Sequence, residues 1–123
     1  FIAYLSDVSG TNEVYVDSFP KPSSARRVAT GGAALQLDLR SDGKELFILA
    51  ADGDRASLFA SELRSGAPLE TGRPQKLFTL PVEWSGFAPA PKGDRFLLLE
   101  RVGNRSPSLT LVDNWRAQLA PEK

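Results

Sequence analysis

The chain has 123 residues, with 15 Lys and Arg against 15 Asp and Glu, so its formal net charge is zero. This balance lacks the basic excess of nucleic-acid-binding domains, and 41% hydrophobic residues is too high a share for an intrinsically disordered chain. His and Cys are absent, which excludes disulfides, thiolate ligands, Cys nucleophiles and the commonest general base. We therefore predict no catalytic residue, no metal site, no cofactor and no partner nucleic acid. Met is absent too, and the chain starts at Phe1, so we expect it to be part of a longer polypeptide.

Short strands separated by turns account for the first third of the chain. Residues 2–5 and 13–19 are apolar or alternating, and they flank a turn rich in Gly, Asn, Asp and Ser, which predicts an antiparallel hairpin. Residues 25–30 form a short polar segment that we expect to be an outer strand. Gly31 and Gly32 then break the chain and predict a tight connection rather than a phosphate-binding loop, because no helix follows them.

The middle of the chain contains the strongest strand signal. Leu35, Leu37 and Leu39 alternate with polar residues, the period of a half-buried strand. A polar turn at residues 41–44 (Ser-Asp-Gly-Lys) then leads into an apolar strand at residues 45–50, which returns as a strand over residues 57–63.

The last third continues in the same way, with an outer strand at residues 75–80 and an inner strand at 83–88. Residues 95–100 and 108–113 form the final hairpin, and residues 114–119 read as a helical turn or a tail. No segment keeps an apolar period of 3.6 residues, and no apolar run reaches the roughly 20 residues that span a bilayer, so we predict no membrane insertion. The predicted fold class is all-β.

The turn followed by an apolar strand is repeated. Aligning Phe1 with Leu46 and Leu46 with Phe96 gives spacings of 45 and 50 residues. A four-stranded unit of about 40–50 residues is typical of a β-propeller blade. We predict four-stranded antiparallel blades of the β-propeller type, about two and a half of them. Residues 1–30 form a partial blade (strands B–D), 31–80 a complete blade, 81–115 a partial blade (strands A–C), and 116–123 a C-terminal tail. A β-sandwich is the alternative.

The repeated unit resembles the PD40 or TolB-like propeller repeat of bacteria, in which a Ser-Pro-Asp-Gly-Lys turn precedes a Phe-rich strand. Residues 40–47 (RSDGKELF) carry the better match; residues 90–97 (APKGDRFL) depart from it, with Lys92 in place of the Asp. Residues 6–16 are similar to the family's B–C hairpin, and residues 109–115 to the end of propellers in long bacterial proteins with an upstream kinase or winged-helix domain. The resemblance implies a location outside the cytoplasm, in the periplasm or cell envelope, on which the residues themselves are silent.

These features predict a non-catalytic binding or interaction module within a larger bacterial propeller protein, one that recognises a protein, a peptide or a small ligand. The alternative is the substrate-gating propeller portion of a serine peptidase of the prolyl oligopeptidase kind, whose catalytic domain would be separate. An incomplete set of blades also predicts self-association through exposed blade faces.

Polar or aromatic residues on the predicted inner strands are the candidate ligand-binding groups of a central channel. They are Gln36, Asp38, Glu83 and Trp84. Asp42, Asp52 and Asp54 lie in Gly-containing turns, but their spacing differs from that of a calcium loop, so we interpret them as turn residues.

Overall fold

The computed structural model describes residues 2–19, 21, 25–64, 70–80, 84–100 and 108–113. These residues form antiparallel β-strands and no helix, which confirms the predicted all-β class. Within the same residues, no helix has the length and apolar character that crossing a membrane requires.

The described residues form eleven strands. They are β1 (Ile2–Ser6), β2 (Glu13–Asp17), β3 (Arg26–Val28), β4 (Ala34–Leu39), β5 (Glu45–Asp52), β6 (Arg55–Arg64), β7 (Glu70–Thr71), β8 (Gln75–Leu80), β9 (Trp84–Pro89), β10 (Arg95–Glu100) and β11 (Ser108–Asp113). Every strand predicted from the sequence is confirmed to within a few residues. The structure adds one short strand, β7, in a segment that was predicted to be loop.

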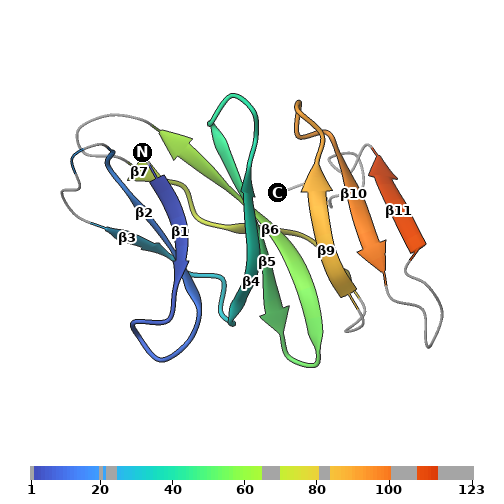
Figure 1. Cartoon of the computed structure of the whole chain (residues 1–123), viewed down its shortest axis with the longest axis horizontal. Coiled ribbons are helices and arrows are strands. Elements are labelled where there is room, and N and C mark those ends of the chain that lie inside the picture. Colours follow the sequence, from blue (N-terminus) through green and yellow to red (C-terminus); the bar gives the residue numbers. More distant parts are fainter. Residues whose placement is uncertain are drawn as a thin grey trace, which may run out of the picture.

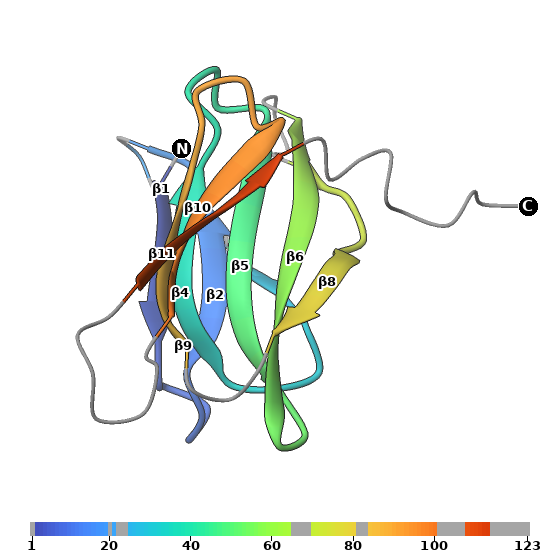
Figure 2. The same cartoon turned by 90° about the vertical axis from the view of Figure 1, so that its right-hand side faces the viewer.

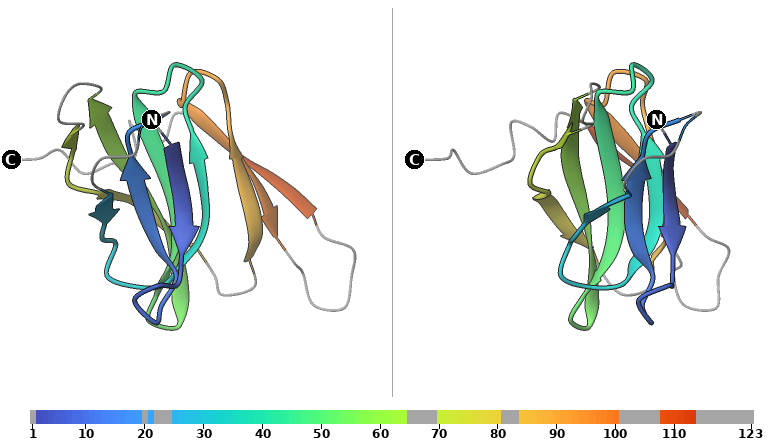
Figure 3. Two further views of the ribbon diagram at one scale, coloured as in Figure 1. Left: turned by 60° about the vertical axis from the view of Figure 1, so that its left-hand side comes forward. Right: turned by 90° about the vertical axis from the view of Figure 1, so that its left-hand side faces the viewer.

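These strands make three sheets, none of which closes on itself. The first sheet has the order β1-β2-β3, the middle sheet runs β4-β5-β6 with β7 and β8 both paired to β6, and the last sheet has the order β9-β10-β11. Figure 1 shows the three sheets side by side, and the view turned by 90° in Figure 2 shows them overlapping as layers. Figure 3 brings the first sheet in front of the middle one.

The outer edge of the middle sheet is formed by two successive strands, β7 and β8, which both pair with β6. β7 pairs with the end of β6 through Leu63↔Thr71, and β8 pairs with its start, up to Ala60↔Gln75. Pro74 lies between them and has no backbone N–H to donate to the ladder, which explains the break. Gly72, within this interruption, stays close to β6: its N–H donates to Glu62 O at 2.8 Å, and its carbonyl accepts from the hydroxyl of Ser61 at 2.7 Å.

The predicted repeat is present in the hydrogen bonds of two turns. Arg40 N donates to Glu45 O and Gly43 N to Arg40 O, and fifty residues later Ala90 N donates to Arg95 O and Gly93 N to Ala90 O, at 2.8–2.9 Å. Gly43 and Gly93 have φ of 71° and 69°, so the positive φ expected of this turn is confirmed. Sequences that differ at most turn positions therefore adopt one backbone conformation.

The repeat includes an irregularity that the sequence does not reveal. In the β4–β5 ladder the register shifts between Ala34 and Gln36, and in the β9–β10 ladder it shifts between Trp84 and Gly86, again fifty residues later. The extra residue at the first bulge is Leu35, whose side chain is exposed. The predicted alternation of Leu35, Leu37 and Leu39 is therefore wrong at Leu35: Ala34 joins the core in its place, because a bulge turns the side chain of the extra residue aside.

The first hairpin corrects the predicted spacing of 45 residues. The pair Ile2↔Asp17 corresponds to Leu46↔Ser61, and Leu5↔Val14 to Leu49↔Leu58, so the hairpins are related by 44 residues. A shift of one residue exchanges the two faces of a strand. Ile2, rather than Phe1, therefore occupies the position of Leu46.

The core consists of two layers, one on each face of the middle sheet. Residues 46–50 of β5 are all buried, alternately against the first and the last sheet. Leu46 and Ile48 pack with Val14 and Val16 of the first sheet, whereas Phe47 packs against the last sheet. A strand that is covered on both faces explains why the sequence shows a continuous apolar run here.

The middle and last sheets are joined most closely at their turns. The rings of Phe47 and Phe96 meet edge to face with centroids 4.9 Å apart, and the hydroxyl of Ser41 donates to the carbonyl of Pro91 at 2.8 Å. A Cβ placed on Gly93 would lie 2.8 Å from Cδ of Arg40 and 3.2 Å from Cζ of Phe47. Gly93 is thus needed both for its positive φ and for the close approach of the neighbouring sheet.

Candidate functional site

The first strands of the middle and last sheets carry the groups predicted to bind a ligand. β4 lies against both β1 and β9. The amide of Gln36 reaches across from β4: Nε2 donates to Phe87 O at 2.8 Å, and Oε1 accepts from Phe87 N at 3.1 Å. Gly86 leaves room for this contact, because a Cβ there would lie 3.1 Å from Oε1 of Gln36. Gln36 therefore joins two sheets, and its contact with a ligand stays a prediction.

The other predicted groups are placed less fully. Asp38 is half-buried, and its Oδ1 accepts a hydrogen bond from the backbone N–H of Leu39 at 2.8 Å. Trp84 begins β9, with its backbone opposite Glu100, and Glu83 lies outside the described residues. The structure brings the strands of Gln36 and Trp84 to neighbouring sheets without showing a shared ligand site.

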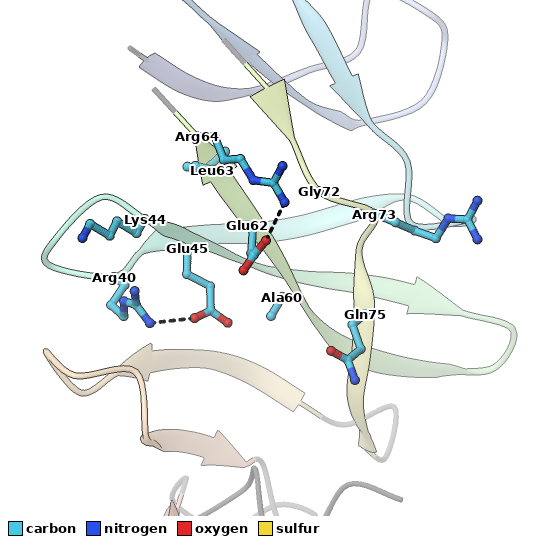
Figure 4. A pocket seen from close by; sticks show the side chains of 10 residues that line it. All are labelled: Arg40, Lys44, Glu45, Ala60, Glu62, Leu63, Arg64, Gly72, Arg73 and Gln75. Carbon is cyan, nitrogen blue, oxygen red and sulfur yellow. Dashed lines mark hydrogen bonds and ion pairs between the residues drawn. The ribbon is translucent and has the colours of Figure 1, made fainter. Parts of the chain in front are cut away.

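A hollow lies elsewhere, beside the interrupted edge of the middle sheet. It has a volume of about 790 Å³ and opens to solvent, and four of its side chains form two ion pairs, Arg40 with Glu45 and Arg64 with Glu62. Figure 4 shows these side chains around the hollow, with Lys44 and Arg73 extending away from it on opposite sides. Its remaining lining is Ala60, Leu63, Gly72 and Gln75. We call this hollow the charged pocket.

Two glutamates stand on neighbouring strands in the charged pocket. Glu45 of β5 and Glu62 of β6 are direct cross-strand partners, so their side chains leave the same face of the sheet. Like charges at such positions destabilise a sheet. Each carboxylate has its own guanidinium: Arg40 lies 2.9 Å from Glu45, and Arg64 lies 3.3 Å from Glu62. Each carboxylate is thus paired with an arginine, while Lys44 and Arg73 add two further cations to the lining and extend away from the hollow (Figure 4).

The two carboxylates differ in exposure. The Glu45 side chain is 11% exposed and the Glu62 side chain 69% exposed, so Glu62 is the one that a molecule from solvent meets first. Arg40 is held further by Asp42 at 2.8 Å. The hydrogen bond from Arg40 lowers the pKa of the Asp42 carboxyl, with the backbone N–H of Lys44 adding to the effect, and the same contact raises the pKa of Arg40. One wall of the pocket is thereby a fixed array of charges.

A second hollow of about 360 Å³ lies beside the connection into the middle sheet, lined by Glu13, Arg27 and the Gly31–Gly32 segment among others. A Cβ on Gly32 would collide with the carbonyl oxygen of Ala51, and Gly31 has a φ of 88°. The glycines thus make a tight connection, as expected from the sequence. The two charged residues of this hollow, Glu13 and Arg27, form an ion pair at 3.2 Å.

The turn aspartates behave as side chains that organise turns and edges. Asp42 accepts from the backbone N–H of Lys44 at 2.9 Å, and Asp52 accepts from Lys76 at 2.6 Å and from the buried Ser57 hydroxyl at 2.7 Å. The hydrogen bond from Lys76 is the main reason why the pKa of Asp52 is lowered. Among the described residues, no group of three or more acidic side chains is arranged to hold a metal ion.

Sequence reasoning missed the charged pocket. Glu45 is the first residue of an apolar strand, and Glu62 lies between Ser61 and Leu63 near the end of the return strand. Charged residues inside such strands are a signal that we did not use. Comparison with known proteins gives no assignment: no family model matches the chain, and a search of the curated proteins finds no match.

Proposed function

We propose that the three sheets are blades of a β-propeller. Three features that recur fifty residues apart support this reading: the turn hydrogen bonds, the positive φ of Gly43 and Gly93, and the bulge near the start of β4 and β9. The middle sheet is packed on both faces, as a blade within a ring is. The β-sandwich alternative does not call for equivalent bulges in successive sheets.

We propose that this scaffold is a non-catalytic binding module and that the charged pocket receives a basic side chain of a peptide or protein partner. The observation that carries the proposal is the direct pairing of Glu45 with Glu62 in the ladder. A cation between the two carboxylates would relieve their repulsion, which the fold otherwise offsets with two arginines. An open polar hollow suits a protruding side chain better than a small apolar ligand, which needs an enclosed apolar cavity.

The rigid surroundings favour recognition over chemistry. Glu45 is fixed by Arg40, and β5 and β6 pair over their whole length around a two-residue turn. Glu62 stands beside this fixed pair and is open to solvent, and a charge-assisted hydrogen bond to it is worth about 1.5–3 kcal/mol. The absence of His and Cys fits a module of this kind.

A peptide selection tests the proposal. A random peptide library is selected on the full chain, and enriched peptides are measured by calorimetry against the unmodified protein and two variants. We expect enriched peptides to carry Lys or Arg, and we expect Glu62→Gln to weaken binding about tenfold or more. Glu70→Gln is the matched control, because Glu70 also lies near Arg64, at 3.9 Å, but does not line the pocket. Enriched peptides without a basic residue, or equal affinities for both variants, would refute the assignment.

A further inference from the structure

The two end sheets expose side chains at the positions that the middle sheet buries. On the face of the middle sheet that meets the first sheet, Leu46 and Ile48 are fully buried. The residues 44 positions earlier, related through the hairpin ladders, are Ile2 and Tyr4. These are 43% and 37% exposed, and the ring of Tyr4 stacks on Tyr15 with centroids 5.8 Å apart. The outer face of the first sheet is thus an apolar blade face without a cover.

The last sheet has the same property on its opposite face. Phe47 of the middle sheet is fully buried against the last sheet, and its equivalent fifty residues later is Leu97, which is 41% exposed. Leu97 leaves the opposite side of β10 from Phe96 and Leu98, which are both buried toward the middle sheet. The uncovered face of the first sheet is therefore equivalent to one face of the middle sheet, and the uncovered face of the last sheet is equivalent to the other.

Equivalent positions meet at both contacts between neighbouring sheets. Between the middle and last sheets, Phe47 meets Phe96. Between the first and middle sheets, the equivalent positions are Ala3 and Leu46, and Ala3 packs against the cluster that contains Leu46. At a further contact of the same kind, between a last sheet and a first sheet, the equivalent positions are Leu97 and Ile2.

We propose that Leu97 of one chain packs against Ile2 of a second copy, so that two copies close head to tail into a ring of six sheets. The inference rests on the proposed propeller fold. It continues two interfaces that already exist within the chain, and six sheets lie within the about four to eight blades with which propellers close. A repeated head-to-tail contact gives a closed ring only if its rotation completes a circle, and here the second contact completes it.

Engineered cysteines test this contact, because the chain has none of its own. Packed sheets are about 10 Å apart and a disulfide needs Cα atoms within about 7 Å, so a bifunctional maleimide that spans the gap between sheets is the appropriate reagent. We expect Ile2→Cys/Leu97→Cys to give a cross-linked dimer on a denaturing gel. We expect Val8→Cys/Leu97→Cys to remain monomeric, because Val8 is 80% exposed in the turn after β1, away from the proposed contact.

Sedimentation of the unmodified protein provides the second readout, and we expect dimers. Ile2→Glu should convert the dimers to monomers, whereas Val8→Glu should leave the dimers intact. Three results would overturn the inference: a monomer at all concentrations, cross-linking in the Leu97→Cys single variant, or a ladder of larger species. The peptide titration on the same samples separates the two proposals. If the protein is a monomer that still binds basic peptides through Glu62, the proposed dimer is refuted and the proposed binding function is supported.

Discussion

Substitution of Gly93 by Ala separates two costs that the turn imposes. An L-residue at positive φ costs about 1–2 kcal/mol, and crowding a packed interior costs about 1–3 kcal/mol more. At Gly93 both apply: φ is 69°, and a Cβ would lie 2.8 Å from Cδ of Arg40 and 3.2 Å from Cζ of Phe47. Neither neighbour can move freely, because Arg40 is held by two carboxylates and Phe47 is fully buried. We expect Gly93→Ala to lower the free energy of unfolding by about 2–5 kcal/mol.

Gly53→Ala is the matched control for this substitution. Gly53 has a φ of 64°, and nothing lies within 4 Å of the Cβ position, so only the backbone cost of about 1–2 kcal/mol applies. Urea unfolding followed by far-UV circular dichroism measures both variants, and melting temperatures should differ in the same order, by roughly 4 °C per kcal/mol. Equal losses in the two variants would refute the packing of the two turns against each other.

Three further substitutions test the sheet contacts and their charges. Phe47→Ala should cost about 3–5 kcal/mol in chemical unfolding, whereas Phe19→Ala, at a side chain that is 64% exposed, should cost well under half of that, and similar values would contradict the burial of Phe47. Gln36→Leu should cost about 1–3 kcal/mol, because it leaves a backbone N–H and C=O of β9 without their partner; an unchanged midpoint would argue against the bridge. Because the folded pKa of Asp52 lies below its ordinary 3.8, the unfolded chain takes up this proton first as the pH falls. Its stabilisation is present above 3.8 and lost as the pH drops through the folded pKa, so Asp52→Asn should flatten the acid dependence of the melting temperature; an unchanged pH profile would argue against the contact with Lys76.

Local patterns were sufficient for the strands and turns of this chain. Turn residues and alternating apolar positions are short-range signals, and they located β5, β8 and β10 to within two residues. The repeat spacing of 50 residues was also readable, since it depends on two turns with one backbone geometry. The spacing of the first hairpin was misread by one residue, because an apolar run such as FIAYL does not show which of its residues face the core.

The features that required the structure depend on pairs of distant residues. A bulge at Leu35 leaves no local mark, because it is defined by the register against β5. Gln36 was singled out as a polar group on an inner strand, but its partner Phe87 lies fifty-one residues away in another sheet. Glu45 and Glu62 become a pair only once the hairpin register is known. Sequence patterns therefore anticipated the scaffold, whereas the pocket follows from long-range pairing.

The positions that do not repeat indicate where the scaffold has been given a function. The turn glycine, the bulge and the apolar strand recur in the middle and last sheets, where they accompany the packing of one sheet against the other. The carboxylate pair does not: Arg95 stands fifty residues after Glu45, and Ser18 stands 44 residues before Glu62. The fold thus tolerates a cation or a neutral side chain at these positions. Two neighbouring carboxylates, each paired with an arginine, are consequently a property of this sheet, and they are the groups on which the proposed binding of a basic side chain rests.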